Sequence, residues 1–314
     1  MPGIAIIANP NSRKNRANPK IIEGLRARIE GHGRLFSTSS LSELAEVAEA
    51  VKAMAPDVLC FNGGDGTNHC SLSAVLNVWG ERPIPPLAFL KGGTMNTVTS
   101  GMGIKGSAQE ILDLVVQRHA AGEALPTTEL MTLKVDGDKY GFLFGTGMQA
   151  RFLEIYYEGG DASPWKAVKV LSACVGSTLI RGEVYRRMST PDRLHVDADG
   201  QRWPFDQWDM VGAGTVPNIA FFFRPYYRAG EDPQRFHTWG VACGAGVLSM
   251  KLPRIAMAQP PDHPRIVDQL ASDLVFSGDD ILWQIDGEIY RTRDRLTVAC
   301  GPHVRVVTPG VEER

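Results

Sequence analysis

Within residues 4–115 the sequence repeats one pattern four times: a short apolar segment, a turn rich in Gly, Ser or Asn, and a segment whose apolar residues recur at helical spacing. The apolar segments begin at Ile4, Leu35, Val58 and Leu87. Strands that alternate with helices in this way build a parallel sheet covered by helices. We therefore predict an α/β domain in the N-terminal part of the chain, over residues 1–125.

A polar turn follows each of these expected strands. The turns are residues 9–13, 37–40, 62–67 and 91–96. The carboxyl ends of parallel strands meet at one edge of a sheet, and ligands bind beyond that edge. We therefore expect the four turns to line one crevice.

The pattern changes near residues 122–128, after which apolar residues alternate with polar ones and Asp-Gly pairs separate the segments. The pairs at Asp136, Asp199 and Asp286 predict three β-hairpins, the first with strands at residues 130–135 and 140–144. A long helix is expected between the first two hairpins, with Ser163 as its N-cap and an apolar face from Trp165 to Leu179. The sequence thus predicts a β-rich, sandwich-like C-terminal domain over residues 126–299, and leaves open whether the tail at about 300–314 returns to the first domain.

Charge and composition narrow the class of function. The net charge of -2 gives no basic face, so a nucleic-acid partner is not expected. Five cysteines, widely spaced in mostly apolar surroundings, are expected to be reduced and buried. The chain enters a strand pattern at Ile4 without a signal-peptide pattern, and it has no apolar run of about 18 residues. We expect a cytoplasmic protein without a transmembrane span.

The turn Asn62-Gly63-Gly64-Asp65-Gly66-Thr67 lies between an apolar strand and a helix-patterned segment. Glycines let backbone N–H groups turn toward an anion, and the positive end of the following helix points to the same place. The carboxylate of Asp65 beside phosphates indicates a nucleotide with Mg2+. The turn is neither a P-loop, because the closing lysine is missing, nor a dinucleotide loop, because the glycine spacing differs. Taken alone, such a turn is about as often a tight connection as a binding site.

Several separated motifs together resemble the diacylglycerol kinase-like lipid kinases, a family that includes bacterial diacylglycerol kinases, sphingosine kinases and ceramide kinases. The resemblance spans nearly the whole chain. The motifs are Asn9-Pro10-Asn11-Ser12, Gly63-Gly64-Asp65-Gly66-Thr67, Lys91-Gly92-Gly93-Thr94-Met95-Asn96, the glycine-bearing strand Phe144 to Ala150, and Asp286-Gly287-Glu288.

The resemblance implies that ATP lies in a cleft between the two domains and that a lipid hydroxyl, diacylglycerol-like or sphingoid, receives its γ-phosphoryl group. Asp65 would act on Mg2+ directly or through water, and Asp286 or Glu288 would accept the hydroxyl proton. The implied partners are the lipid substrate and a transient membrane surface, and a homodimer is left open. The implied nucleotide-binding residues are Asn9, Ser12, Thr38, Gly63, Gly64, Asp65, Gly66, Thr67, Gly93, Thr94 and Asn96.

Three departures from the family pattern each remove a carboxylate. Cys70 stands where many members carry glutamate, and Thr97 stands where an aspartate usually follows the loop asparagine. An aspartate-glycine-leucine motif is not recognisable in residues 232–239, after a loop at 224–229 that resembles the family's, which puts a structural Mg2+ site in doubt. Glu129 either replaces an aspartate of the polar network around the phosphates and the metal or is a solvent-exposed residue.

Other interpretations of these residues stay open. Asp286 is also an ordinary hairpin residue, Thr38 is also a helix-cap candidate, and His69 is expected to be packed rather than catalytic. An NAD kinase shares the Gly-Gly-Asp-Gly-Thr loop, although the Asn9-Pro10 and Gly93 to Asn96 loops favour the lipid family. A non-catalytic nucleotide- or lipid-binding protein of the same fold is the remaining alternative.

Overall fold

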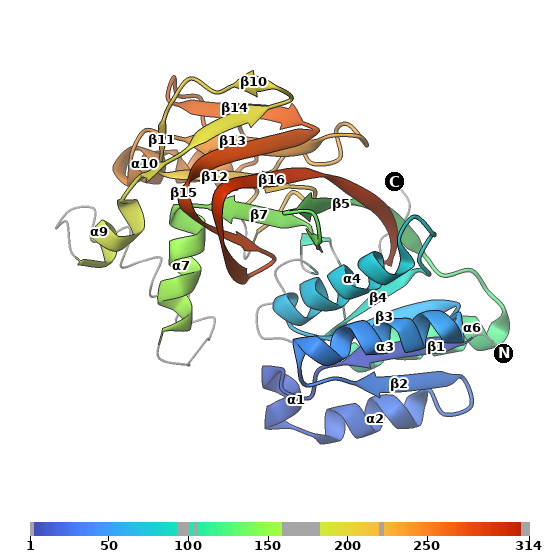
Figure 1. Ribbon diagram of the computed structural model, residues 1–314. Helices are drawn as coiled ribbons and strands as arrows, with labels where there is room; N and C mark the ends of the chain where they lie inside the picture. The colour runs from blue at the N-terminus through green and yellow to red at the C-terminus, as the bar shows by residue number, and fades with distance from the viewer. Residues whose placement is uncertain are drawn as a thin grey trace. The chain divides into compact units, whose positions relative to one another are not determined.

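The computed structural model describes residues 3–92, 99, 101–102, 104, 106–158, 183–219 and 223–308. The chain divides into two compact units (Figure 1). Unit 1 comprises Met1–Leu130, Asp138–Tyr140 and Pro302–Arg314, and unit 2 comprises Met131–Gly137 and Gly141–Gly301.

Unit 1 contains a parallel sheet with the strand order β2-β1-β3-β4-β16. The last strand enters through the C-terminal tail, where Val306 pairs in parallel with Leu87. Every residue of β1 and β3 is buried, which explains why both read as continuous apolar runs rather than alternating ones. The strands are β1 (Ile4–Ala8), β2 (Gly33–Ser37), β3 (Val58–Gly63), β4 (Leu87–Lys91) and β16 (Glu288–Val307).

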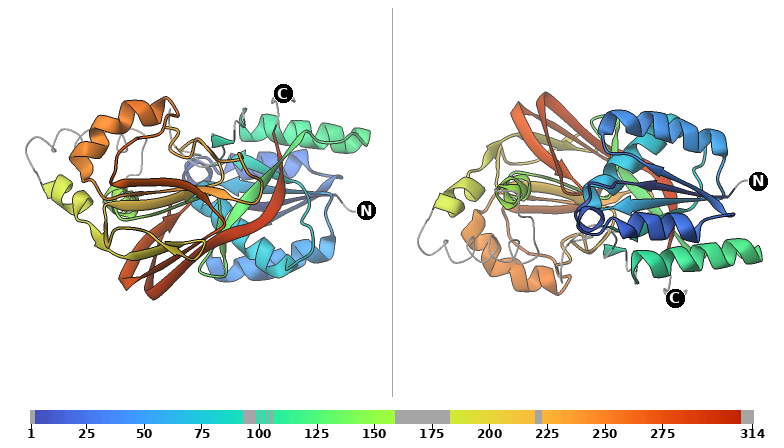
Figure 2. Two further views of the ribbon diagram at one scale, coloured as in Figure 1. Left: turned by 90° about the horizontal axis from the view of Figure 1, so that it is seen from above. Right: turned by 90° about the horizontal axis from the view of Figure 1, so that it is seen from below.

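Helices cover both faces of this sheet. The helix α3 packs against α4 on one face, and α2 packs against α6 on the other (Figure 2). The helix α3 buries Leu44, Ala48 and Val51, three of the residues whose spacing predicts it. The parallel α/β domain is therefore confirmed. The helices are α1 (Arg13–Ala17), α2 (Lys20–Arg28), α3 (Leu41–Met54), α4 (Asp65–Trp79) and α6 (Ala108–Ala121).

Unit 2 is β-rich, as predicted. Its central strands follow the order β14-β13-β12-β7-β15-β16, all antiparallel, and β9 also pairs with β15. The core contains Phe144, Trp208, Phe236, Phe276 and Trp283. The elements after α6 are β5 (Thr127–Val135), β6 (Lys139–Gly141), β7 (Leu143–Thr146), α7 (Met148–Tyr157), α9 (Glu183–Ser189), β8 (Asp192–Arg193), β9 (His195–Ala198), β10 (Gln201–Arg202), β11 (Gln207–Trp208), β12 (Met210–Gly214), β13 (Phe236–Val241), α10 (Ala245–Ala256), β14 (Ile266–Ala271) and β15 (Asp273–Ile285). The start of β5 and residues 139–140 of β6 belong to unit 1.

The three Asp-Gly pairs form the predicted turns. Asp136, Asp199 and Asp286 have φ values of 51°, 50° and 48°, and the glycine after each also has positive φ. Two successive residues with positive φ are the geometry of a type I′ hairpin turn.

One detail of the first predicted hairpin is wrong, because residues 140–144 do not form one strand. The chain breaks at Phe142 between β6 and β7, since the N–H groups of Phe142 and Leu143 donate to the carboxylate of Asp286 instead of a neighbouring strand. The long helix expected from Ser163 lies outside the described residues.

The described cysteines, Cys60, Cys70, Cys243 and Cys300, are free thiols, as expected. The expectation that they are buried is correct for Cys60 alone, where burial raises the pKa of the thiol to about 12. The other three are half-buried.

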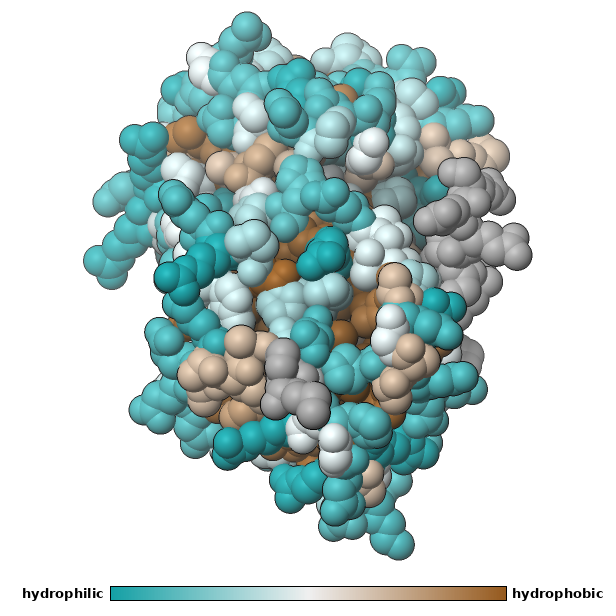
Figure 3. Space-filling model, turned by 90° about the vertical axis from the view of Figure 1, so that its right-hand side faces the viewer, coloured by the Kyte–Doolittle hydropathy of each residue, from teal (hydrophilic) through white to brown (hydrophobic). Residues whose placement is uncertain are grey.

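Hydrophilic side chains cover most of the face that Figure 3 shows, and apolar side chains show in smaller areas between them. Within the described part of the chain, no helix combines the length and the apolar character that crossing a membrane requires.

Candidate active site

The carboxyl ends of the unit 1 strands lie level with one another. Ala8, the last residue of β1, pairs with Ser37 on one side and with Asn62 on the other, and Gly63 pairs with Lys91. The chain therefore leaves β1, β2, β3 and β4 at one edge of the sheet. The turns predicted to line a crevice all start at this edge.

The glycine turn places backbone where side chains would not fit. A Cβ atom on Gly63 would lie 2.3 Å from the Cβ of Thr67, because the first turn of α4 folds back over the end of β3. A Cβ on Gly92 would lie 2.9 Å from the backbone nitrogen of Gly63. Both glycines are therefore required by close approach, and the ends of β3 and β4 present bare backbone.

The helix α4 begins directly after this turn, at Asp65, with Gly64 as its N-cap. Gly64 has no side chain that could accept hydrogen bonds from the first N–H groups of the helix, so the N-cap residue provides no side-chain cap. These groups and the helix dipole together favour an anion at the start of α4. Asp65, Gly66 and Thr67 lie in this first turn and are half-buried.

The loop after β1 is bonded directly to the glycine turn. The side-chain amide of Asn9 donates to the hydroxyl of Thr67 over 3.0 Å, and the backbone N–H of Asn9 donates to Asn62 O over 3.0 Å. The Asn9 Oδ1 atom accepts from the backbone N–H of Asn11 at 2.8 Å, which shapes the loop itself. The motifs at residues 9–12 and 63–67 therefore form one structure.

Two buried asparagines, Asn15 and Asn62, complete this connection, and neither was among the predicted binding residues. The amide of Asn15 donates to Asn9 O and to Asn62 Oδ1, each at 2.7 Å. The amide of Asn62 in turn donates to Leu90 O on β4 at 3.0 Å. This network fixes β1, β3, β4 and α1 relative to one another. The only sequence signal of this network was the position of Asn62, directly before the glycines.

Buried polar atoms without partners indicate that this edge fits a polar ligand. The hydroxyl of Ser12 and the Oδ1 atom of Asn68 are both buried, and neither forms a hydrogen bond with a described residue. Buried polar groups normally have a partner, so an unpaired hydroxyl in the loop that contacts Thr67 is a place where a ligand oxygen would bind. A nucleotide phosphate or ribose offers such oxygens.

Two lysines add positive charge beside the end of β4, and sequence patterns did not single them out. The ammonium group of Lys14 donates to Lys91 O over 3.3 Å, and that of Lys91 donates to Ile104 O. Partial burial, followed by the charge of Lys14, lowers the pKa of Lys91. An anion near the two lysines would relieve this repulsion.

Thr38 lies at the same edge, directly after β2, and is buried. Its backbone N–H donates to Ala8 O at 3.0 Å and its hydroxyl donates to Ser40 O at 3.0 Å. The alternative that Thr38 caps α3 is wrong, because the N-cap is Ser40. The Thr38 hydroxyl instead shapes the turn that leads into the helix.

His69 has the packed role expected of it. Its Nδ1 atom lies 2.7 Å from Tyr140 O, so this nitrogen carries the proton and donates it to the carbonyl. Burial is the main cause that lowers the pKa of His69 to about 4. A neutral imidazole fixed in this way holds the N-terminal part of α4 in place.

Backbone N–H groups donate hydrogen bonds to the carboxylate of Asp286, which lies in unit 2. Its Oδ1 accepts from the N–H groups of Leu143 at 2.8 Å and Phe142 at 3.0 Å, and its Oδ2 lies 3.1 Å from the Phe142 nitrogen. The backbone N–H of Asp286 donates to Leu143 O at 2.9 Å. A Cβ on Gly141 would lie 2.5 Å from the same carboxylate, so the approach is tight. Asp286 thus anchors the β15–β16 hairpin to the start of β7.

Glu288 follows two residues later, as the first residue of β16, and differs from Asp286. It is half-buried, and its side chain forms neither a hydrogen bond nor an ion pair within the described part of the chain. Burial raises the pKa of Glu288. A desolvated carboxylate of this kind is a stronger base than a solvent-exposed one.

Other predicted residues lie outside the described part of the chain or on its surface. Gly93, Thr94 and Asn96 of the third motif, and Thr97 after them, lie outside the described residues. Glu129 is exposed. Among the residues that the structure describes, no group of three His, Cys, Asp or Glu side chains is arranged to hold a metal ion. A single carboxylate such as Asp65 still fits Mg2+, which takes many of its ligands from substrate phosphates and water.

The region where the aspartate-glycine-leucine motif is missing contains a different polar cluster. His237 Nε2 lies 2.9 Å from Asp268 Oδ1, and the Tyr227 hydroxyl donates to Asp268 Oδ2 at 2.7 Å. These bonds lower the pKa of Asp268 against the opposing effect of burial. Both oxygens of the carboxylate are therefore engaged by side chains.

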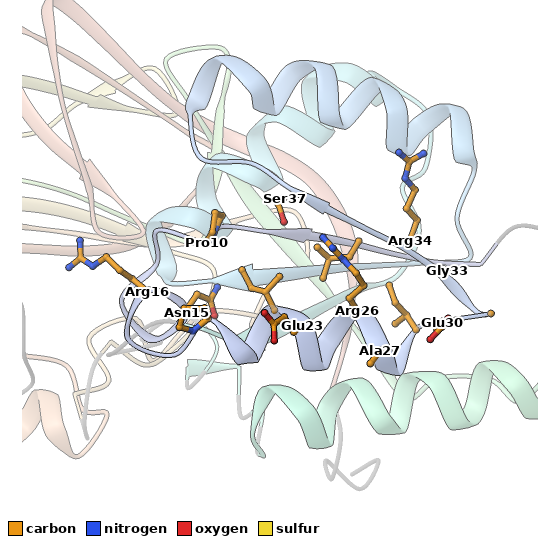
Figure 4. Close-up of a pocket in the computed structure, with 15 residues that line it drawn as sticks. Pro10, Asn15, Arg16, Glu23, Arg26, Ala27, Glu30, Gly33, Arg34 and Ser37 are labelled. Carbon is orange, nitrogen blue, oxygen red and sulfur yellow. The ribbon is translucent and has the colours of Figure 1, made fainter.

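A hollow of about 910 Å³ lies in unit 1 between α2 and β2 (Figure 4). Its lining includes Pro10, Asn15 and Ser37 from the sheet edge described above, and charged residues of α2 such as Glu23 and Arg26. It contains no residue of the glycine turn at 63–67.

Comparison with protein families adds independent evidence on this arrangement. Residues 3–123 match the family model of the diacylglycerol kinase catalytic domain. This part of the chain is therefore similar to the diacylglycerol kinase catalytic domain. The matched region of the catalytic domain contains all the predicted nucleotide-binding residues, from Asn9 to Asn96, whereas Asp286 and Glu288 lie beyond it. The match is to the catalytic domain of a kinase family, whose reaction is phosphoryl transfer.

Solved structures extend the likeness beyond the catalytic domain. A candidate diacylglycerol kinase from Bacillus anthracis strain Sterne superimposes with a TM-score of 0.71 at 17% identity, over 99% of this chain and 98% of the other. A diacylglycerol kinase from the same strain gives 0.63 at 16% identity, over 99% and 98%. At such identity the likeness shows the fold. A search of the curated proteins finds no match.

Proposed function

We propose that the protein is an ATP-dependent lipid kinase that transfers the γ-phosphoryl group of ATP to a lipid hydroxyl, diacylglycerol-like or sphingoid. The observation that carries the proposal is the start of α4, where Gly64 is the N-cap and Thr67 accepts a hydrogen bond from Asn9 of the neighbouring loop. Phosphoryl transfer depends mainly on positioning and charge stabilisation, and this edge of unit 1 supplies both.

In this proposal the turn at residues 63–67 holds the phosphates through backbone N–H groups. Lys14 and Lys91 balance their negative charge, and the unpaired hydroxyl of Ser12 binds a nucleotide oxygen. Asp65 holds Mg2+ directly or through water. When bound, Mg2+ would neutralise charge on the phosphate oxygens.

Glu288 is our choice for the general base, and Asp286 for a positioning residue. The raised pKa of Glu288 makes its carboxylate a better acceptor for the hydroxyl proton of the lipid. The Asp286 carboxylate is occupied by two backbone N–H groups, and it fixes the turn from which Glu288 extends.

The test is a radiolabel assay with the full chain, labelled ATP and Mg2+. The acceptors are dispersed diacylglycerol, a sphingoid base, a total lipid extract and NAD. We expect label in a lipid, and none after Asp65→Asn. The matched control, Asp138→Asn, changes a carboxylate that is exposed on the surface and should keep full turnover.

Other outcomes would replace the proposal. Label in NAD alone would identify a soluble-substrate kinase. Calorimetric binding of ATP without any labelled lipid or ATP hydrolysis would identify a non-catalytic nucleotide-binding protein.

A further inference from the structure

The helix α10 of unit 2 carries apolar side chains on two opposite sides. Ala245, Leu248 and Ile255 are buried against the unit. Met250 and Met257, seven residues apart and therefore on one side of the helix, are 72% and 61% exposed. α10, drawn in orange, lies on the outside of unit 2 (Figure 2).

Exposed apolar residues on this scale are unusual for the chain. The structure describes four large hydrophobic side chains as exposed, and two of them are these methionines. An apolar pair exposed on the side of a helix opposite its buried residues is a feature of surfaces that contact a partner. The outer side of α10 therefore has the character of a docking surface.

Positive charge borders the methionines. Lys251 donates to the backbone oxygen of Asp262 at 3.0 Å and Arg254 to that of Pro260 at 2.8 Å. Neither side chain forms an ion pair with a described residue, and Asp262 is the single acidic residue between positions 242 and 267. The cations are therefore positioned by carbonyl groups and keep their charge available for a partner.

We propose that the outer face of α10, defined by Met250, Lys251, Arg254 and Met257, docks on an anionic lipid bilayer. The methionines would enter the boundary of the acyl chains, while the two cations stay at the level of the lipid phosphates. This inference rests on the proposed function, in which the acceptor lipid is held in a membrane.

The same charges argue against a second copy of the chain as the occupant. A two-fold contact through this face would bring Lys251 and Arg254 of one copy into the same small interface as the same two cations of the other. Like charges facing each other across an interface weaken it. An anionic bilayer offers the complementary charge.

The experiment measures binding of the full chain to sedimented vesicles without ATP. Vesicles of phosphatidylcholine alone are compared with vesicles that also contain phosphatidylglycerol. We expect binding to the anionic vesicles that weakens with added salt. The variant Met250→Gln/Met257→Gln should lose most of it, and Lys251→Gln/Arg254→Gln should lose about fivefold for each cation removed.

The matched control is Leu41→Gln on α3, where the native side chain is 70% exposed and lies in unit 1. It should bind vesicles like the wild type. Equal binding by the Met250→Gln/Met257→Gln variant would overturn the proposal. So would a dimer in sedimentation that this variant dissociates, because it would make a second copy the occupant.

Turnover on a detergent-dispersed acceptor separates the two proposals. Loss of vesicle binding with retained turnover on that acceptor is the expected result for the methionine variant. Absence of lipid phosphorylation by the wild type would instead overturn the proposed function.

Discussion

The amide of Asn9 donates to the hydroxyl of Thr67 across 58 residues of sequence, and the bond joins the loop after β1 to the first turn of α4. Two motifs that each suggest a nucleotide thereby form one rigid surface. Thr67 also lies against Gly63, so the same side chain defines how the helix starts.

Removal of this bond should weaken both the fold and nucleotide binding. Thr67→Val keeps the shape of the side chain and leaves the Asn9 amide unpaired. We expect a double-mutant cycle with Asn9→Ala to give a coupling of about 1 kcal/mol in the free energy of unfolding. Urea unfolding of the four proteins measures it. A coupling near zero would mean that the two loops are held together by other contacts.

Gly63→Ala should be strongly destabilising and should abolish ATP binding. The added Cβ would meet Thr67 at 2.3 Å, so the start of α4 has to move away from the end of β3. The control is Gly246→Ala, at a position in α10 where a Cβ meets nothing within 4 Å. Calorimetric titration with ATP checks both variants. Normal affinity in Gly63→Ala would show that the turn does not hold the phosphates.

His69 should make the stability of the protein fall as the pH drops. Burial lowers the pKa of His69 to about 4, whereas the unfolded chain takes up the proton near its usual value of 6.5. The stabilisation is therefore complete above pH 6.5 and is lost progressively down to pH 4.

Between pH 7 and pH 5 this linkage should cost about 2 kcal/mol in the free energy of unfolding. His69→Gln keeps an N–H donor for Tyr140 O but does not titrate, so its stability should change less over the same range. Urea unfolding at both pH values checks the difference. Identical pH dependence in the two proteins would contradict a buried neutral imidazole.

Much of this architecture can be predicted from short sequence patterns. Apolar runs such as Val58 to Phe61 predict the buried strands, and the Asp-Gly pairs predict the type I′ turns, because both depend on neighbouring residues. Gly63 was recognisable as part of a phosphate-type turn for the same reason. The close approach of Thr67 that requires it appears only in the folded chain.

What the sequence did not predict depends on contacts between distant residues. Asn15 has no motif of its own and acquires its role by bridging to Asn62, which is 47 residues away. The break at Phe142 is imposed by the carboxylate of Asp286, 144 residues later. Lys14 and Lys91 come together only when α1 returns to the end of β4. Local pattern contains none of these pairings.

Variants of Asp286 and Glu288 should show different defects: the first should lose stability and the second should lose turnover. Asp286→Asn replaces one acceptor oxygen by an N–H group facing the N–H of Phe142. We expect it to lose about 1–3 kcal/mol of stability and to keep measurable turnover. Glu288→Gln removes a half-buried charge, so at neutral pH it should be at least as stable as the wild type. Its turnover should fall by about 10²–10⁴. Unfolding curves and the radiolabel assay on both variants decide the assignment, which would be reversed if Asp286→Asn were stable and inactive.

The pH profile of turnover should report the ionisation of Glu288. A general base works only when deprotonated, so kcat/KM should fall on the acid side as Glu288 takes up its proton. Burial raises its pKa, and the acid limb should therefore lie above the usual range of a glutamate. Glu288→Asp, which shortens the side chain, should keep an acid limb at lower rate, whereas Glu288→Gln should flatten it. An unchanged acid limb in Glu288→Gln would assign the titration to another group.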